Sequence, residues 1–221
     1  MRRVTVLRPE PGASATLDRL RKRGVEAISV PLFKVEPVEW RAPDPSAFDA
    51  LLLTSANAAR FGGRELGKLT KLPVYAVGEA TAQAAREAGL TVAMIGDRGI
   101  DALLGQIEPR LRLLHLCGAD RKAPEPGRQA ITPVIVYRSD PVTAPNLAAA
   151  VGSVAMIHSP RAGRRFAELT TDRASIAVAA ISAAAADACG SGWRSVDVAE
   201  QPSDDALLAL AVALCNKPSP K

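Results

Sequence analysis

The side chains of this sequence that are best suited to chemistry are hydroxyls that follow short apolar runs. They are Thr54-Ser55, Thr81 with Gly78 just before it, and His158-Ser159. Ligands of doubly wound sheets bind where strands end, and backbone amides at helix N-termini can bind carboxylates. These positions are therefore candidate anion-binding groups. For any one of them alone, simple capping of the following helix is the favoured alternative.

Tyr137 is a candidate acid because a phenol can donate a proton to a departing hydroxyl. It ends the apolar run 132–137 and precedes Arg138. Tyrosine is also a common strand residue, so packing in the core is an equal alternative. His115 and His158 fall within apolar runs, where a structural role is more common than catalysis.

Several kinds of chemistry have no sequence signature here. The chain has no glycine-rich phosphate loop and no serine in a nucleophile-elbow motif. Cys117, Cys189 and Cys215 are odd in number and match no metal-ligand spacing. We therefore expect no metal, no cofactor and no disulfide framework, which favours the reducing cytoplasm. The most apolar helix candidate, 207–215, is about half as long as a membrane span requires.

The charge balance indicates an anionic partner of small size. The net charge is +5, the pI is about 9.4, and aromatic residues make up only 4% of the chain. Nucleic-acid binders need stacking residues and dense basic surfaces, whereas Lys and Arg are spread along this sequence. We therefore expect the anionic partner to be a small polyacid.

Several of the candidate residues lie in an internal repeat of the sequence. Two stretches align without gaps at an offset of 104 positions, which places Ser55 on Ser159 and residues 101–104 on 205–208. Such a constant register indicates duplication of a structural unit. The length of 221 residues suits one large domain or two of about 100 residues each.

Each copy alternates short apolar runs with amphipathic segments. We expect strands at 50–54, 74–77 and 91–95, at 154–158, 176–181 and 195–198, and at 4–7, 27–32, 111–117 and 132–137. We expect helices at 13–23 and 81–88, ended by Gly24 and Gly89 in the left-handed conformation. Runs that are apolar on both faces predict parallel sheets covered by helices. So many strands suit two sheets better than one.

Five ordered motifs resemble those of the uroporphyrinogen-III synthase family. They are LRPEPGA at 7–13, LTSANA at 53–58, YAVGEATA at 75–82, VYR at 136–138 and HSPRA at 158–162. Their order and spacing carry the resemblance, which extends from about residue 4 to residue 214.

The resemblance implies an α/β fold of two flavodoxin-like, doubly wound parallel-sheet domains joined by a two-stranded linker. Domain 1 is then discontinuous, with residues 1–36 and 139–221, and domain 2 spans 37–138. The family's active site lies in the cleft between its domains.

The resemblance also implies the reaction. The family dehydrates the linear tetrapyrrole hydroxymethylbilane and closes it to uroporphyrinogen III, inverting the last ring, through a spiro intermediate. The substrate carries eight carboxylates, so the positive net charge of the protein would attract it. We expect a monomer without cofactor, membrane or nucleic-acid partner, with transient hand-over of substrate from the preceding enzyme.

Family residues transfer onto four positions of this chain. Tyr137 matches the tyrosine proposed to help the hydroxyl depart, and Ser55, Thr81 and Ser159, with neighbouring amides at Thr54 and Gly78, are expected to bind carboxylates. Electrostatics alone suggests Arg8, Arg138 and Arg161 as further carboxylate partners.

The chain departs from the family pattern at three places. Ser182 and Ala185 replace Gly78 and Thr81 in the second copy, and Asn57 stands where many relatives have arginine. A short Pro-rich loop at 123–129 replaces a helix that is usual in the family.

Two other classes of function remain open at this point. The first is a non-catalytic two-domain α/β module that binds an anionic small molecule. The second is a nucleic-acid-binding regulator, which would require salt-sensitive binding.

Overall fold

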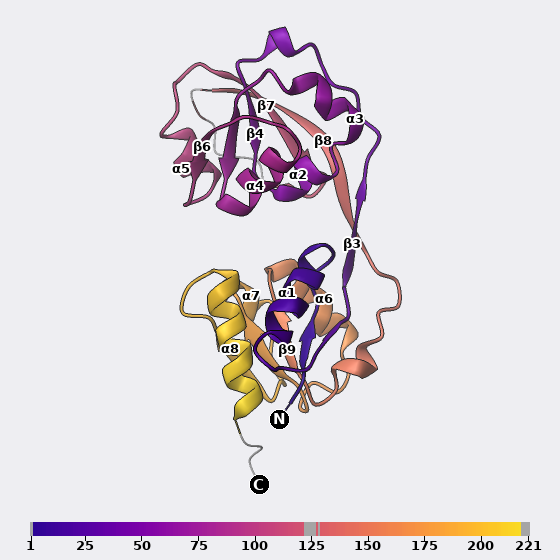
Figure 1. Ribbon diagram of the computed structural model, residues 1–221. Helices are drawn as coiled ribbons and strands as arrows, with labels where there is room; N and C mark the ends of the chain where they lie inside the picture. The colour runs from indigo at the N-terminus through magenta and orange to yellow at the C-terminus, as the bar shows by residue number, and fades with distance from the viewer. Residues whose placement is uncertain (1, 122–126, 128, 218–221) are drawn as a thin grey trace. The chain divides into compact units, whose positions relative to one another are not determined.

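The computed structural model describes residues 2–121, 127 and 129–217 (Figure 1). It divides into two compact units, each described here by itself. Unit 1 contains Met1–Lys34 and Pro141–Lys221, and unit 2 contains Val35–Asp140. The Pro-rich segment expected at 123–129 lies, apart from Gly127 and Gln129, outside the described residues.

Unit 1 is built on a parallel sheet of five strands. In chain order these are β1 (Val4–Val6), β2 (Ala27–Ser29), β9 (Val154–Ile157), β10 (Ala177–Ala180) and β11 (Ser195–Val198), and their order in the sheet is β11-β10-β9-β1-β2. All four neighbouring pairs are parallel. This is the 2-1-3-4-5 order of flavodoxin-like folds.

Helices cover both faces of this sheet because its strands alternate their buried side chains. Val154 and Met156 of β9 pack in one core with α1 (Gly12–Arg21) and α8 (Asp204–Asn216). Ala155 and Ile157 pack in the other core with α6 (Pro160–Leu169) and α7 (Ala183–Asp187). A strand buried on both faces requires the continuous apolar run seen in the sequence.

Unit 2 holds the second sheet. Its strands are β3 (Phe33–Pro37), β4 (Ala50–Leu53), β5 (Val74–Val77), β6 (Val92–Gly96), β7 (Arg112–Gly118) and β8 (Ala130–Pro141), in the order β3-β8-β7-β4-β5-β6. The pairs from β8 to β6 are parallel. The chain passes from unit 1 to unit 2 within β3 and returns at the end of β8.

The helices of unit 2 also lie on both faces of the sheet. Leu51 and Leu53 pack in a core with α2 (Ala56–Arg60), α3 (Gly63–Leu66) and α4 (Glu79–Glu87). Ala50 and Leu52 pack in another core with α5 (Ile100–Leu104). Three short 3₁₀ turns complete the described elements, Pro45–Ala47 and Gly67–Leu69 in unit 2 and Leu147–Ala150 in unit 1.

The two sheets are circular permutations of one arrangement. Strands β4-β5-β6 of unit 2 and β9-β10-β11 of unit 1 form equivalent ends of their sheets. The other places are filled by β7 and β8, which follow the repeat in unit 2, and by β1 and β2, which precede it in unit 1. Helices α2, α4 and α5 start 104 positions before α6, α7 and α8.

The expected α/β architecture with two doubly wound parallel sheets is confirmed. Gly24 and Gly89 have the predicted positive φ, 68° and 79°. Several expected bounds were wrong. The strand expected at 27–32 ends at Ser29, and the strand expected at 132–137 runs from Ala130 to Pro141. The helix expected at 13–23 ends at Arg21, and the helix expected from Thr81 starts at Glu79. None of the helices formed by the described residues has both the length and the apolarity needed to cross a membrane.

Candidate functional site

In unit 2 the predicted residues gather at one edge of the sheet. Thr54 and Ser55 follow β4, and Gly78 follows β5, the strand paired with β4. On the other side of β4, β7 ends at Gly118, which pairs with Tyr137 of β8. Because these strands are parallel, their carboxyl ends lie together, which is where doubly wound sheets bind ligands.

Tyr137 is half-buried and its phenol is held in place by three neighbours. Its hydroxyl lies near the Ser55 side chain, close enough for hydrogen bonding to affect the pKa of the phenol. Its ring centroid lies 6.3 Å from that of Phe61, and its phenol end lies against the backbone of Gly118. Burial raises the pKa of Tyr137, and the hydrogen bond with Ser55 opposes that change. The phenol is therefore protonated at neutral pH and can act as a proton donor.

Thr54 is paired with a buried histidine. Its Oγ1 lies 3.0 Å from His115 Nε2, and His115 is only 1% exposed. Burial, assisted by the charge of Arg121, lowers the pKa of His115 to about 4. The imidazole is therefore neutral at physiological pH and takes part in the packing between β4 and β7.

Gly78 begins α4 with φ 82° and ψ 149°, and no side chain caps this helix. Thr81 lies in the first turn and is 5% exposed. At the equivalent positions of unit 1, Ser182 caps α7 by accepting from the Ala185 amide, and Ala185 is completely buried. The position of Thr81 is thus a core position in both copies, whereas Gly78 leaves the first amides of α4 without a side-chain acceptor.

In unit 1 Ser159 occupies the carboxyl end of β9 and caps α6. Its Oγ accepts from the Ala162 amide at 3.2 Å. Arg161, in the first turn of α6, lies with its guanidinium 4.3 Å from the centroid of the Phe33 ring. The capping alternative thus holds for Ser159, as it does for Ser55, whose Oγ accepts from the Asn57 amide.

Arg8 reaches the same edge of unit 1 from the loop after β1 and is bound by an acid. Its Nη1 donates to Asp204 Oδ2 at 2.7 Å. Burial raises the pKa of Asp204, but the hydrogen bond and charge of Arg8, together with the charges of His158 and Arg19, hold that pKa below its usual value. His158 Nε2 lies 4.0 Å from Asp204 Oδ1. Burial, with the charge of Arg8, lowers the pKa of His158 to about 4 although Asp204 acts against this.

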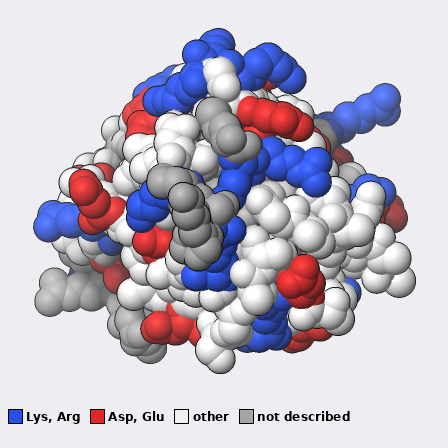
Figure 2. Space-filling view, turned by 90° about the horizontal axis from the view of Figure 1, so that it is seen from below, with Lys and Arg blue, Asp and Glu red and all other residues white. Residues whose placement is uncertain are grey.

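Arg138 also forms ion pairs within its own unit. It lies 2.6 Å from Asp140 and 3.4 Å from Glu36, and about half of its side chain is exposed. The carboxylates beside Arg8 and Arg138 reduce the net charge that either offers to an anion. On the molecular face drawn in Figure 2, Asp and Glu likewise lie among the Lys and Arg side chains.

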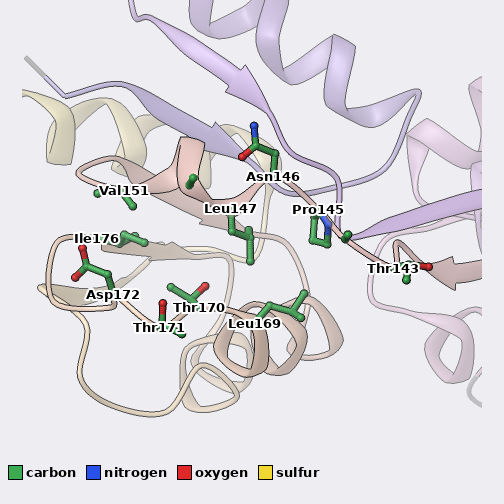
Figure 3. Close-up of a pocket in the computed structure, with 12 residues that line it drawn as sticks. Thr143, Pro145, Asn146, Leu147, Val151, Leu169, Thr170, Thr171, Asp172 and Ile176 are labelled. Carbon is green, nitrogen blue, oxygen red and sulfur yellow. The ribbon is translucent and has the colours of Figure 1, made fainter.

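Unit 1 contains a cavity of about 510 Å³ (Figure 3). Its lining includes Leu147, Val151, Leu169, Thr170 and Ile176. Val151 and Ile176 precede β9 and β10, so the cavity is at the amino ends of these strands. Ser159 follows the opposite, carboxyl end of β9. The cavity therefore contains none of the predicted site residues.

Sequence reasoning missed several residues that contact the predicted ones, among them Asp204 and Gly118. Asp204 was not predicted, because a pair of acids at the start of an apolar run resembles an ordinary helix N-terminus. Gly118 was not predicted, because its contact with Tyr137 depends on strand pairing. Within the described ranges, no group of three His, Cys, Asp or Glu side chains is placed to bind a metal, and the three cysteines are free and buried.

Comparison with known proteins gives one family. The model of the family described as "Uroporphyrinogen-III synthase HemD" matches residues 14–209. No curated protein sequence matches the chain significantly.

Solved structures of similar fold carry related descriptions. Uroporphyrinogen-III synthetase from Helicobacter pylori is 18% identical, with a TM-score of 0.66 over 97% of this chain and 100% of that one. A mutant uroporphyrinogen III synthase from Thermus thermophilus is 19% identical, with a TM-score of 0.53 over 98% and 100%. At these identities the likeness shows the fold alone.

Proposed function

The chain belongs to the uroporphyrinogen-III synthase family, and from this premise we propose how its residues perform the family's reaction. It is an enzyme of tetrapyrrole biosynthesis, a cyclising hydro-lyase that converts hydroxymethylbilane into uroporphyrinogen III. The observation that carries this assignment is the family match over residues 14–209, which includes most of both units.

Tyr137 is proposed as the acid of the dehydration step. The bond between the terminal carbon and its hydroxyl breaks, and the phenol proton leaves with the hydroxyl as water. The substrate is left as an azafulvenium cation beside a phenolate. Burial keeps the phenol protonated beforehand, and the hydrogen bond with Ser55 stabilises the phenolate that forms.

The remaining steps depend on geometry more than on acid strength. The cation attacks the substituted carbon of the last ring, and the spiro intermediate fragments and recloses with that ring inverted. The proton lost on final closure can return to the phenolate of Tyr137. Holding the two ends of a flexible chain together removes entropy that would otherwise oppose the attack.

Carboxylate binding is proposed at the strand ends of both units. In unit 2 the first amides of α4 have no side-chain acceptor, and the helix N-terminus favours an anion beside Gly78. In unit 1 the proposed carboxylate-binding group is the N-terminus of α6, with Ser159 and Arg161. Roles for Thr54, Thr81, Arg8 and Arg138 in binding stay predictions, and Thr81 is the least accessible of these.

The test is incubation with freshly prepared hydroxymethylbilane and chromatographic separation of the product isomers. We expect the type III isomer to dominate, whereas spontaneous closure gives type I. A product that is only type I would overturn the assignment and support the binding module instead. Family membership argues against that module, and against a nucleic-acid regulator.

Tyr137→Phe tests the acid. We expect kcat to fall by roughly 10²-fold, the lower end for a lost general acid, with the fold retained. Tyr75→Phe, the other tyrosine of the chain, is the matched control and should remain fully active. Full activity of Tyr137→Phe would reject the proton-donor role and leave the family assignment intact.

A monomer, a cytoplasmic location and transient hand-over of substrate from the preceding enzyme complete the proposal. The three free, buried cysteines are compatible with a reducing compartment. Analytical ultracentrifugation with and without the preceding enzyme tests the monomer and the hand-over, because a lasting complex or a dimer would contradict them.

A further inference from the structure

Gly118 is in contact with the reactive end of Tyr137. A Cβ added to Gly118 would lie 2.6 Å from Tyr137 Cζ, 2.7 Å from Cε2 and 2.9 Å from Oη. Cβ atoms in proteins essentially never approach other atoms this closely. The phenol therefore occupies the space that any other residue at position 118 would fill with its side chain.

Backbone conformation does not explain the glycine. Gly118 is the last residue of β7, and it is absent from the glycines with positive φ. Its backbone is therefore open to other residues. The glycine is needed at this position because a side chain here would collide with the phenol of Tyr137.

A bulge between β7 and β8 creates this contact. Cys117 pairs with Ile135, but the next residue, Gly118, pairs with Tyr137 instead of Val136. The Ala119 amide then donates to the Tyr137 carbonyl at 3.0 Å, which continues the pairing past the bulge. Bulges of this kind change the direction of a side chain and occur next to active sites.

We infer that Gly118 is a positioning residue for the dehydration: by lacking a side chain it lets the Tyr137 phenol lie against the end of β7, within reach of Ser55. This inference rests on the proposed function of Tyr137. It assigns Gly118 no contact with the substrate, because the residue acts through the phenol.

Gly118→Ala tests the inference by kinetics. We expect kcat to fall by about as much as in Tyr137→Phe, with little change in KM. In the Tyr137→Phe background the same substitution should produce no further fall in kcat, because the group that it displaces is already inactive. Gly67→Ala is the control, since Gly67 has φ −61° and nothing within 4 Å of an added Cβ. Additive losses in the double variant would overturn the inference.

Two further measurements do not depend on activity. Alkaline titration of tyrosinate absorbance, in a Tyr75→Phe background, should show a lower pKa for Tyr137 in Gly118→Ala. The displaced phenol is more hydrated, and the loss of burial has a larger effect on its pKa than the loss of Ser55, which acts in the opposite direction. An unchanged titration would contradict the inference even if activity fell. If Tyr137→Phe proves fully active, the proposed acid role fails while this titration still tests the positioning.

Stability provides the rescue experiment. If Gly118→Ala is destabilised or fails to fold, truncation of the ring in Gly118→Ala/Tyr137→Ala should restore the urea midpoint to that of Tyr137→Ala alone. A double variant that remains as destabilised as before would show that the ring is not the reason for the glycine, and would overturn the inference.

Discussion

Burial keeps three titratable side chains of the candidate site in their neutral forms. It raises the pKa of Tyr137 and lowers the pKa values of His115 and His158 to about 4. The protein thus has a protonated phenol and two uncharged imidazoles at the strand ends where a polyanion is proposed to bind. Of these three groups, the phenol is the strongest acid near neutral pH, because a neutral imidazole N–H is much less acidic than a phenol.

The two histidines predict acid sensitivity. An unfolded histidine binds its proton near pH 6.5, but both folded imidazoles remain neutral until about pH 4. Between these values the unfolded state binds more protons, so the free energy of unfolding falls as the pH is lowered. Each histidine should remove about 2 kcal/mol between pH 7 and pH 5.

Urea unfolding of the wild type and of His158→Gln at several pH values measures this effect. The variant should lose the part of the pH dependence that belongs to His158 and keep the part that belongs to His115. Equal slopes for the two proteins between pH 7 and pH 5 would contradict the buried neutral state of His158.

At the scale of elements, the two copies begin their helices differently. Ser55 and Ser159 both cap their helices with a side chain, although Ser55 accepts from the amide of Asn57 and Ser159 from that of Ala162. At the other two equivalent places unit 1 uses Ser182 and Ser203 as side-chain caps, whereas unit 2 has Gly78 and Gly99 at positive φ without a side-chain cap. Unit 2 therefore lacks, at the start of α4 and α5, the N-cap side-chain acceptors that unit 1 has at α7 and α8, which supports the proposed anion binding beside Gly78.

Gly78→Ala should destabilise the protein through its backbone alone. The φ of 82° and ψ of 149° are close to a region that is essentially restricted to glycine, and nothing lies within 4 Å of an added Cβ. We expect a loss of roughly 1–3 kcal/mol in the free energy of unfolding. Gly67→Ala, at helical φ and ψ, should be neutral or slightly stabilising. Equal effects in urea titrations would reject the backbone argument.

For the whole molecule, the permuted order of strands determines which segments can fold alone. The parallel strands of unit 2, β4 to β8, follow one another in the sequence. In the sheet of unit 1, β1 pairs with β9, and these two strands are far apart along the chain. Unit 1 thus needs both ends of the chain to complete its sheet.

A fragment of residues 35–140 should therefore fold independently, with a cooperative urea transition and the circular dichroism of an α/β protein. Residues 141–221 alone should not, because their sheet lacks β1 and β2. This experiment also tests the expected domains, 1–36 with 139–221 and 37–138, since a non-cooperative 35–140 fragment would show that unit 2 is not an independent domain.

The class of fold and the family could both be predicted from the order of amino acids. Apolar runs without alternation, glycines after helices and the 104-residue repeat are local or periodic signals, and each follows from how a strand or helix buries its own side chains. The family could be predicted because the order of the motifs around Ser55, Tyr137 and Ser159 is a property of the linear sequence and needs no tertiary structure.

The surroundings of those residues depend instead on contacts between distant segments. Arg8 meets Asp204 across 196 positions, and the bulge that sets Gly118 against Tyr137 arises from the register between two strands. The order of strands in each sheet is also a result of long-range packing. No local pattern specifies such contacts, because they form only when distant segments bury their apolar faces together.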